Sequence, residues 1–352
     1  MSSAAAVATP LDVSSSAEPV VAPRPALLAR SIAWGNVAVM FAYIVASYLA
    51  YWWGWPTLVS IGQSAGLVAG NANGAINGGL AAMQVAIYVL ALLLALGYVL
   101  RTPGTSLRTD ADTISALAGY LVRAAFWGIV LVGVADSVIS AARVEGAVAP
   151  YVGEKMAIDL GRSAWRGLYI HTPLLVLALV IAAFTRTLGF VWLCLLVVVA
   201  EFQIVVSRFI FSYEQGWMGD LVRFWYAALF LLASAYTLRE EGHVRVDVVY
   251  TGLSPRTKGM INFFGAMFLG IVFCWIILAL GTWTRSSVIV GPLISFEVTQ
   301  SGFGLYIKYL MAGLLGVFAI TMLVQFASYM LDALADWRGE PSSRQTSGSS
   351  GH

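Results

Sequence analysis

The sequence predicts an all-α integral membrane protein that crosses the bilayer about eight times. The chain is 59% hydrophobic and 11% charged, against roughly 45–50% and about 25% in an ordinary soluble domain. A hydrocarbon layer about 30 Å thick is crossed by about 20 helical residues, and eight mostly apolar stretches have that length. They are residues 32–53, 79–100, 114–142, 167–185, 187–207, 219–238, 260–283 and 309–331.

The two ends of the chain have a different composition from these spans. Residues 1–26 are dominated by Ala, Ser, Val and Pro, and residues 339–352 by Ser and Gly. Such segments bury too little apolar surface to order themselves, so we expect two disordered tails. The first long apolar run begins at Ile32 and is too long for the core of a signal peptide. We therefore expect it to remain as a membrane anchor.

Lys and Arg residues predict the orientation of the chain. If the N-terminus is cytoplasmic, more of them fall in cytoplasmic segments than in external ones. This distribution favours both termini inside.

Two loops on the predicted outer side differ from each other. Residues 54–78 contain no charged residue and are rich in Gly and Asn, which indicates a flexible or re-entrant connector. In residues 143–166, Met156, Leu160 and Ala164 recur at helical spacing, which predicts a short helix in the membrane interface. A solvated loop is the alternative interpretation.

Charged residues within the predicted spans are few. Arg123, Asp136 and Glu201 lie inside them, and Arg208 and Arg223 lie close to the level of the two acids. Because a charge in the bilayer is costly, we expect a buried ion-pair cluster in which Glu201 pairs with Arg223. Two alternatives stay open, a proton or cation site made by the two carboxylates and simple extension of the side chains to the surface.

Few residues suggest cofactor chemistry. Cys194 and Cys274 lie inside spans, where Cys packs as a small apolar residue. His171 is the one histidine at a span, where we expect an interfacial polar side chain; a membrane haem would need paired ligands on facing helices. We expect no metal, no cofactor and no catalytic residue. The net charge of +2, without a basic run, excludes nucleic acid as a partner.

The second half contains an ordered set of motifs. Arg208 is followed by aromatic residues, Trp217 and Asp220 open the next helix, and Glu297 is followed by Val, Thr, Gly302 and Lys308. Between them the chain reads Arg239-Glu-Glu-Gly-His243-Val-Arg245-Val-Asp247. With four spans at this spacing, residues 188–338 resemble the DctQ-type small permease subunit of tripartite ATP-independent periplasmic (TRAP) transporters. Asp220 stands where that family usually has Glu, and Phe303 and Tyr306 match only loosely an aromatic that commonly precedes the last helix.

Several residues become structural or interface candidates through this resemblance. They are Arg208, Trp217, Asp220, Arg239, His243, Arg245, Asp247 and Glu297. We expect Trp217 at the outer membrane interface, as an aromatic anchor. The turn at residues 239–247 is either a solvated anchor or a polar latch that orders the subunit.

The resemblance implies four segments and a role without catalysis. Residues 187–338 form a DctQ-like four-helix domain, and residues 27–186 form an N-terminal membrane extension of four helices between the tail and that domain. We expect the DctQ-like domain to keep its fold without the extension. The implied function is to scaffold a large permease of the DctM type in the bacterial inner membrane, amid membrane lipid. That permease takes up a small organic acid from a periplasmic binding protein, driven by an ion gradient. The alternative is an autonomous eight-helix carrier or channel that uses Asp136 and Glu201.

Overall fold

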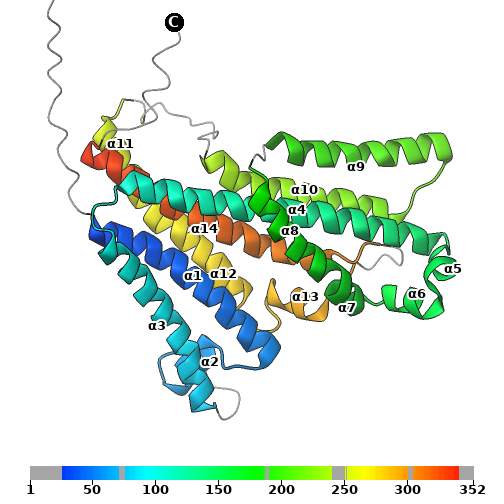
Figure 1. The fold of residues 1–352 in the computed structure, drawn as a ribbon, viewed down its shortest axis with the longest axis horizontal. Coiled ribbons are helices and arrows are strands. Elements are labelled where there is room, and N and C mark those ends of the chain that lie inside the picture. Colours follow the sequence, from blue (N-terminus) through cyan, green and yellow to red (C-terminus); the bar gives the residue numbers. More distant parts are fainter. Residues whose placement is uncertain are drawn as a thin grey trace, which may run out of the picture.

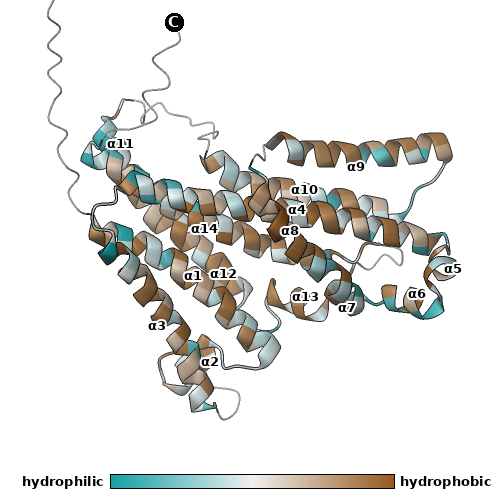
Figure 2. Cartoon of the chain, viewed as in Figure 1, coloured by the Kyte–Doolittle hydropathy of each residue, from teal (hydrophilic) through white to brown (hydrophobic). Residues whose placement is uncertain are grey.

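The computed structural model describes residues 26–70, 76–186, 190–239, 250, 252–299 and 304–340. In these ranges all regular elements are helices, and eight helical segments are long and apolar enough to cross a membrane. This confirms the predicted class and number of spans, whereas the orientation remains a prediction. The long helices form one bundle, and most of their surface is hydrophobic (Figures 1 and 2).

The first half of the chain contributes four spans and several short helices. The elements are α1 (Leu27–Trp53), α2 (Leu58–Ser64), α3 (Gly78–Arg101), α4 (Leu107–Val144), α5 (Val148–Val152), α6 (Glu154–Leu160) and α7 (Ser163–Arg166), followed by the π-helical turn η1 (Gly167–His171) and α8 (Thr172–Phe184). The predicted flexible connector thus contains a helix, α2. The loop that follows α4 contains α5, α6 and α7, so its helical interpretation is confirmed.

The second half contributes the remaining four spans. The elements are α9 (Phe190–Phe211), α10 (Gly216–Arg239), α11 (Pro255–Phe264), the π-helical turn η2 (Gly265–Ile271), α12 (Val272–Gly281), α13 (Val290–Ser295) and α14 (Lys308–Arg338). The segments α11, η2 and α12 are continuous and make one span.

Capping residues explain where several helices begin and end. The side chains of Asn77, Ser106 and Ser254 each accept a hydrogen bond from a backbone N–H in the first turn of the helix that follows, which satisfies a group that the helix itself leaves unpaired. Gly54 and Gly339 end α1 and α14 with φ values of 70° and 73°, a conformation that favours glycine. The cap at Ser106 places the start of α4 before the apolar stretch from which the span was predicted.

Helix α14 is the centre of the bundle. It packs against α1, α4, α10, α11, α12 and α13, and α4 in turn packs against α8 and α10. Gly133 allows the close approach of α4 to α10, because a Cβ atom there would lie 2.6 Å from Trp225 Nε1. Helices α3 and α9 lie on outer flanks, packed mainly on α1 and α10 (Figure 1). The extension is therefore not a separate bundle, since its helix α4 belongs to the core formed with α10 and α14.

The two ends of the bundle can be told apart by the chain termini. The start of α1 and the end of α14 lie at the same end of the bundle (Figure 1), where both contact the start of α4, and we call it the terminal end. At the opposite end, called the loop end, α4 runs into the short helices and α14 begins.

Candidate functional site

A buried network of charged and aromatic side chains lies at the loop end, centred on Asp136 of α4. Its Oδ1 accepts a hydrogen bond from Arg166 Nη1 at 2.7 Å and lies 3.0 Å from His171 Nε2, and its Oδ2 accepts from the backbone N–H of Tyr306 at 2.6 Å. The other ring nitrogen of His171, Nδ1, lies 2.7 Å from the Tyr309 hydroxyl. Asp136, Arg166 and His171 are all 0% exposed. We call Asp136, Arg166, His171, Tyr306 and Tyr309 the Asp136 cluster.

The guanidinium of Arg166 is satisfied within this cluster. Its Nε and Nη2 donate to the carbonyl of Leu160 at 3.0 and 2.7 Å, and Nη1 also donates to Ser140 Oγ at 3.2 Å. Its carbon Cζ lies 4.1 Å from the centre of the Tyr306 ring, a cation–π distance. Since a buried ion pair is stable only when its remaining donors and acceptors are also satisfied, the cluster meets the requirement for a structural ion pair.

The π-helical turn η1 explains how Arg166 and His171 both reach Asp136. Residues five positions apart point about 140° away from each other on a regular α-helix, but a turn with i to i+5 hydrogen bonds brings them to nearly the same side. Pro173 lies two residues after His171, and it has no N–H to donate to a carbonyl in the preceding turn. The expectation that His171 is an interfacial side chain is therefore wrong, because the turn directs it into the protein.

A second buried pair joins α1 to α4 at the terminal end. Arg30 Nε donates to Asp110 Oδ2 at 2.5 Å, and Arg30 Nη1 and Nη2 donate to the carbonyl and hydroxyl of Thr102 at 2.6 and 2.8 Å. Both charged side chains are 1% exposed. Sequence reasoning missed this pair because both residues lie outside the apolar stretches. Helix α4 is thus held by a buried carboxylate near each of its ends.

Two of the family-like motifs meet at Asp220, the residue near the start of α10. Its Oδ2 accepts from the Thr299 hydroxyl at 2.9 Å and from the backbone N–H of Leu305 at 3.1 Å, and its Oδ1 accepts from Arg223 Nη1 at 3.0 Å. Asp220 is 2% exposed. We call Asp220, Arg223, Thr299 and Leu305 the Asp220 cluster. Asp220 and Asp136 therefore bind the neighbouring backbone N–H groups of Leu305 and Tyr306.

The other candidates from the second motif set lie near the surface or outside the described residues. Glu297 accepts a hydrogen bond from Lys308 Nζ at 2.5 Å. Arg208 Nε lies 3.5 Å from Glu214 Oε2, and the side chains of Arg208 and Glu214 are each more than half exposed. Arg239 is the last residue of α10. His243, Arg245 and Asp247 fall outside the described residues.

Trp217 differs from its predicted position. It is 6% exposed and belongs to the hydrophobic core. The prediction of an aromatic anchor facing the membrane interface is wrong, because the first turn of α10 packs this side chain inward.

Tyr213, in the short segment before α10, connects the second half to the loop after α4. Its hydroxyl donates to Glu145 Oε1 at 2.6 Å. This hydrogen bond to a carboxylate, together with partial burial, raises the pKa of Tyr213 above its ordinary value. The contact adds a further link between the two halves at the loop end.

Asp136, Glu201 and Arg223 are not brought together. Arg223 pairs with Asp220, three residues earlier on the same helix, and its side chain is 73% exposed. Asp136 pairs with Arg166, and Glu201 is exposed on α9. The predicted Glu201–Arg223 pair is wrong, because Arg223 forms its ion pair with Asp220 on the same helix. The two carboxylates of the alternative carrier hypothesis also face different surroundings, one in a closed cluster and one at the protein surface.

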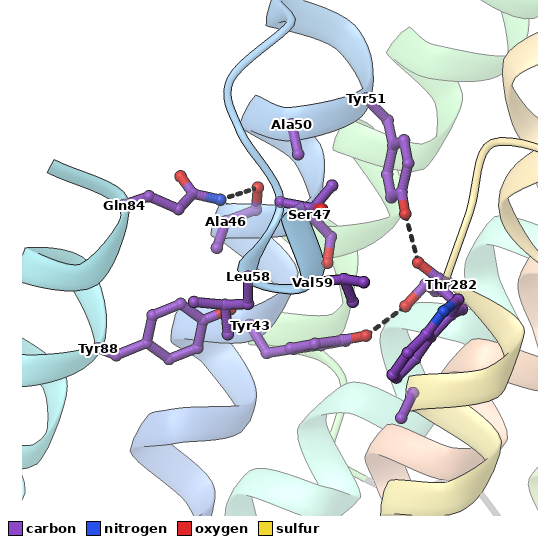
Figure 3. A pocket seen from close by; sticks show the side chains of 13 residues that line it. Tyr43, Ala46, Ser47, Ala50, Tyr51, Leu58, Val59, Gln84, Tyr88 and Thr282 are labelled. Carbon is purple, nitrogen blue, oxygen red and sulfur yellow. Dashed lines mark hydrogen bonds between the residues drawn. The ribbon is translucent and has the colours of Figure 1, made fainter. Parts of the chain in front are cut away.

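A cavity of about 170 Å³ lies between α1, α2, α3 and the segment after α12. Figure 3 shows that Tyr43 and Tyr51 reach from α1 to Thr282, whose side-chain and backbone oxygens bind their hydroxyls at 2.5 Å each. On the other side, Gln84 Nε2 donates to the carbonyl of Ala46 at 2.8 Å. Gln84 Oε1 is buried without a hydrogen-bond partner. The lining is mainly apolar and aromatic, with the hydroxyl groups of Ser47, Thr57 and Tyr88 as further polar groups, and it includes no charged side chain.

Comparison with protein families identifies the second half. Residues 194–336 match the family model described as tripartite ATP-independent periplasmic transporters, DctQ component. The match runs from α9 into the last turns of α14 and includes both Asp220 and the segment that it binds. Comparison with curated proteins and with solved structures gives no match. The chain is a multi-pass membrane protein, and its residues 194–336 match the DctQ component of TRAP transporters.

Proposed function

We propose that this chain is a membrane scaffold, the small subunit that holds the large permease (DctM type) of a TRAP transporter in the bacterial inner membrane. In this proposal the large permease moves a small organic acid that a periplasmic binding protein delivers. A sodium or proton gradient drives the movement. The chain itself contributes no transport site and no catalytic step.

The observation that carries this proposal is the joint anchoring of one segment by both halves of the chain. Asp136 from the extension and Asp220 from the DctQ domain accept hydrogen bonds from the consecutive residues Tyr306 and Leu305. Buried backbone N–H groups need a partner, and a carboxylate acceptor makes a stronger bond than a neutral one. The start of α14, the central helix, is therefore fixed to α4 and α10 together. Such a fixed unit suits a scaffold.

The buried charges support the same role. A transport site opens to water on each side of the membrane in turn, whereas Asp136, Arg166 and His171 are 0% exposed and Asp136 is hydrogen-bonded to both of the others. A polar cluster of this kind stabilises one arrangement of helices. The chemistry therefore favours a static subunit over a carrier that moves substrate through the Asp136 cluster.

Reconstitution tests the proposal. Proteoliposomes with the large permease, this chain and the binding protein receive an imposed sodium or proton gradient and a panel of small carboxylates. We expect uptake with all three proteins and none when this chain is omitted. Accumulation by proteoliposomes that contain this chain alone would contradict the scaffold role and support the autonomous carrier.

A further inference from the structure

Glu201 is a carboxylate in the middle of a membrane span, exposed at the protein surface. The apolar part of α9 runs from Val191 to Phe211, so Glu201 lies about 15 Å from either end at 1.5 Å per residue. Its neighbour Phe202 is 65% exposed, which indicates that this part of α9 faces outward. A charged side chain that faces lipid at this depth is costly, and such residues normally face a protein interior or a partner.

The buried carboxylates of the bundle, unlike the exposed Glu201, have partners within the chain. Asp110 pairs with Arg30, Asp136 with Arg166 and Asp220 with Arg223. Within the described residues, the carboxylate of Glu201 has neither an ion pair nor a hydrogen bond. Arg223, the partner that the sequence predicts for Glu201, pairs with Asp220 instead. The charge of Glu201 therefore has no compensation from the described part of this chain.

The side of α9 that bears Glu201 is distinct from the side that packs on α10. Leu193 and Ala200 are 3% and 1% exposed and face the bundle. Val198 and Val205 lie three residues before and four residues after Glu201, which places all three on one helix face, and the two valines are 60% and 47% exposed. We call Val198, Glu201 and Val205 the Glu201 face. Figure 1 shows α9 on the outer flank of the bundle, where a neighbouring helix can approach.

We propose that the Glu201 face binds a transmembrane helix of the large permease that presents a lysine or arginine to Glu201. Helix association in a membrane depends on close packing and on polar contacts rather than on the hydrophobic effect. The two valines supply a narrow packing surface, and the carboxylate specifies a cation opposite it. A second copy of this chain fits less well, because it would bring a second carboxylate to the same place. The inference rests on the proposed function and adds to it the face and the partner's chemistry.

Co-purification of the tagged chain with the large permease tests the inference. We expect Glu201→Val to lower the recovery of the permease about tenfold. A double variant, Glu201→Val with Val199→Glu, has the same composition as the native chain but moves the carboxylate about 160° around the helix. It should bind as poorly as Glu201→Val alone. The thermal stability of each variant without the permease serves as the folding control, and we expect it to be unchanged or higher.

The outcomes separate the inference from the proposed function. If the native chain binds the permease and Glu201→Val binds it equally well, the docking face is wrong while the scaffold role stands. If the native chain does not bind the permease, the proposed function itself fails.

Photo-crosslinking gives an independent measurement that does not depend on the loss of binding. A photoreactive amino acid at Val198 or Val205 should form adducts with the large permease. The same group at Val199, which is 52% exposed but on the other flank of α9, should form at least tenfold fewer. Equal adducts from Val198 and Val199, or adducts mainly with a second copy of this chain, would overturn the inference.

Discussion

Asp136 and Glu201 are both acidic residues within membrane spans, and their surroundings are opposite. Asp136 is 0% exposed and bonded to Arg166, His171 and the Tyr306 backbone. Glu201 is exposed on a flanking helix and has no partner in the described part of the chain. The position of the helix explains the difference, because α4 is surrounded by other helices whereas α9 packs mainly on α10. One carboxylate serves internal structure, and the other is available for contact with another protein.

Removal of residues 1–186 should destabilise the protein more than either of the single substitutions that follow. The sequence alone suggests that the DctQ domain keeps its fold without the extension. The structure changes this expectation, because α4 packs directly on α10 and α14 and supplies the acceptor for Tyr306. We expect the shortened chain to aggregate or to lose its cooperative thermal transition, as measured by size exclusion and scanning fluorimetry in detergent. A monodisperse chain that melts near the full-length temperature would show that the halves are independent.

Asp136→Ala should cost about 3–5 kcal/mol of stability, since it leaves Arg166 buried without its counter-charge. Denaturation in mixed micelles measures the change. Asp112→Ala is the matched control, because Asp112 lies on the same helix with an exposed side chain, and we expect a change within about 0.5 kcal/mol there. Equal losses in the two variants would mean that the Asp136 cluster contributes no more than a surface charge.

Gln84→Leu should change stability less than the loss of Asp136 or of residues 1–186. The change removes one hydrogen bond to Ala46 but also removes the unpaired acceptor Oε1. These effects oppose each other, so we expect a change within about 1 kcal/mol. Thermal denaturation of the purified chain checks it. A loss above about 2 kcal/mol would indicate that Gln84 Oε1 binds a group in the cavity.

The spans could be predicted from sequence because their signal is local. About 20 apolar residues identify each span, and hydrogen bonds within the helix satisfy the backbone polar groups in the membrane. The DctQ motifs were also visible, and the family match confirms the resemblance over residues 194–336. The contacts that the motif residues make were harder to predict. Asp220 and Thr299 lie far apart in sequence, and their contact depends on how the segment before α14 folds back onto α10.

The ion pairs could not be predicted because they depend on helix packing and on local irregularity. Arg166 lies in a segment that hydropathy assigns to a loop, and the π-helical turn that aligns it with His171 has no clear sequence signature. The pair of Arg30 and Asp110 was missed for a related reason. Hydropathy marks the apolar part of a helix, whereas α1 and α4 both begin several residues earlier.

A double-mutant cycle between Asp136 and Asp220 tests most directly whether the two halves fix the same segment. Asp136→Asn and Asp220→Asn each weaken one anchor of Leu305 and Tyr306, and their effects on unfolding free energy are measured singly and together. Once one anchor is weakened the segment is already loosened, so we predict that the double variant loses less stability than the sum, by at least about 0.5 kcal/mol. Strict additivity would contradict the account, because it would show that the extension and the DctQ domain hold this segment independently.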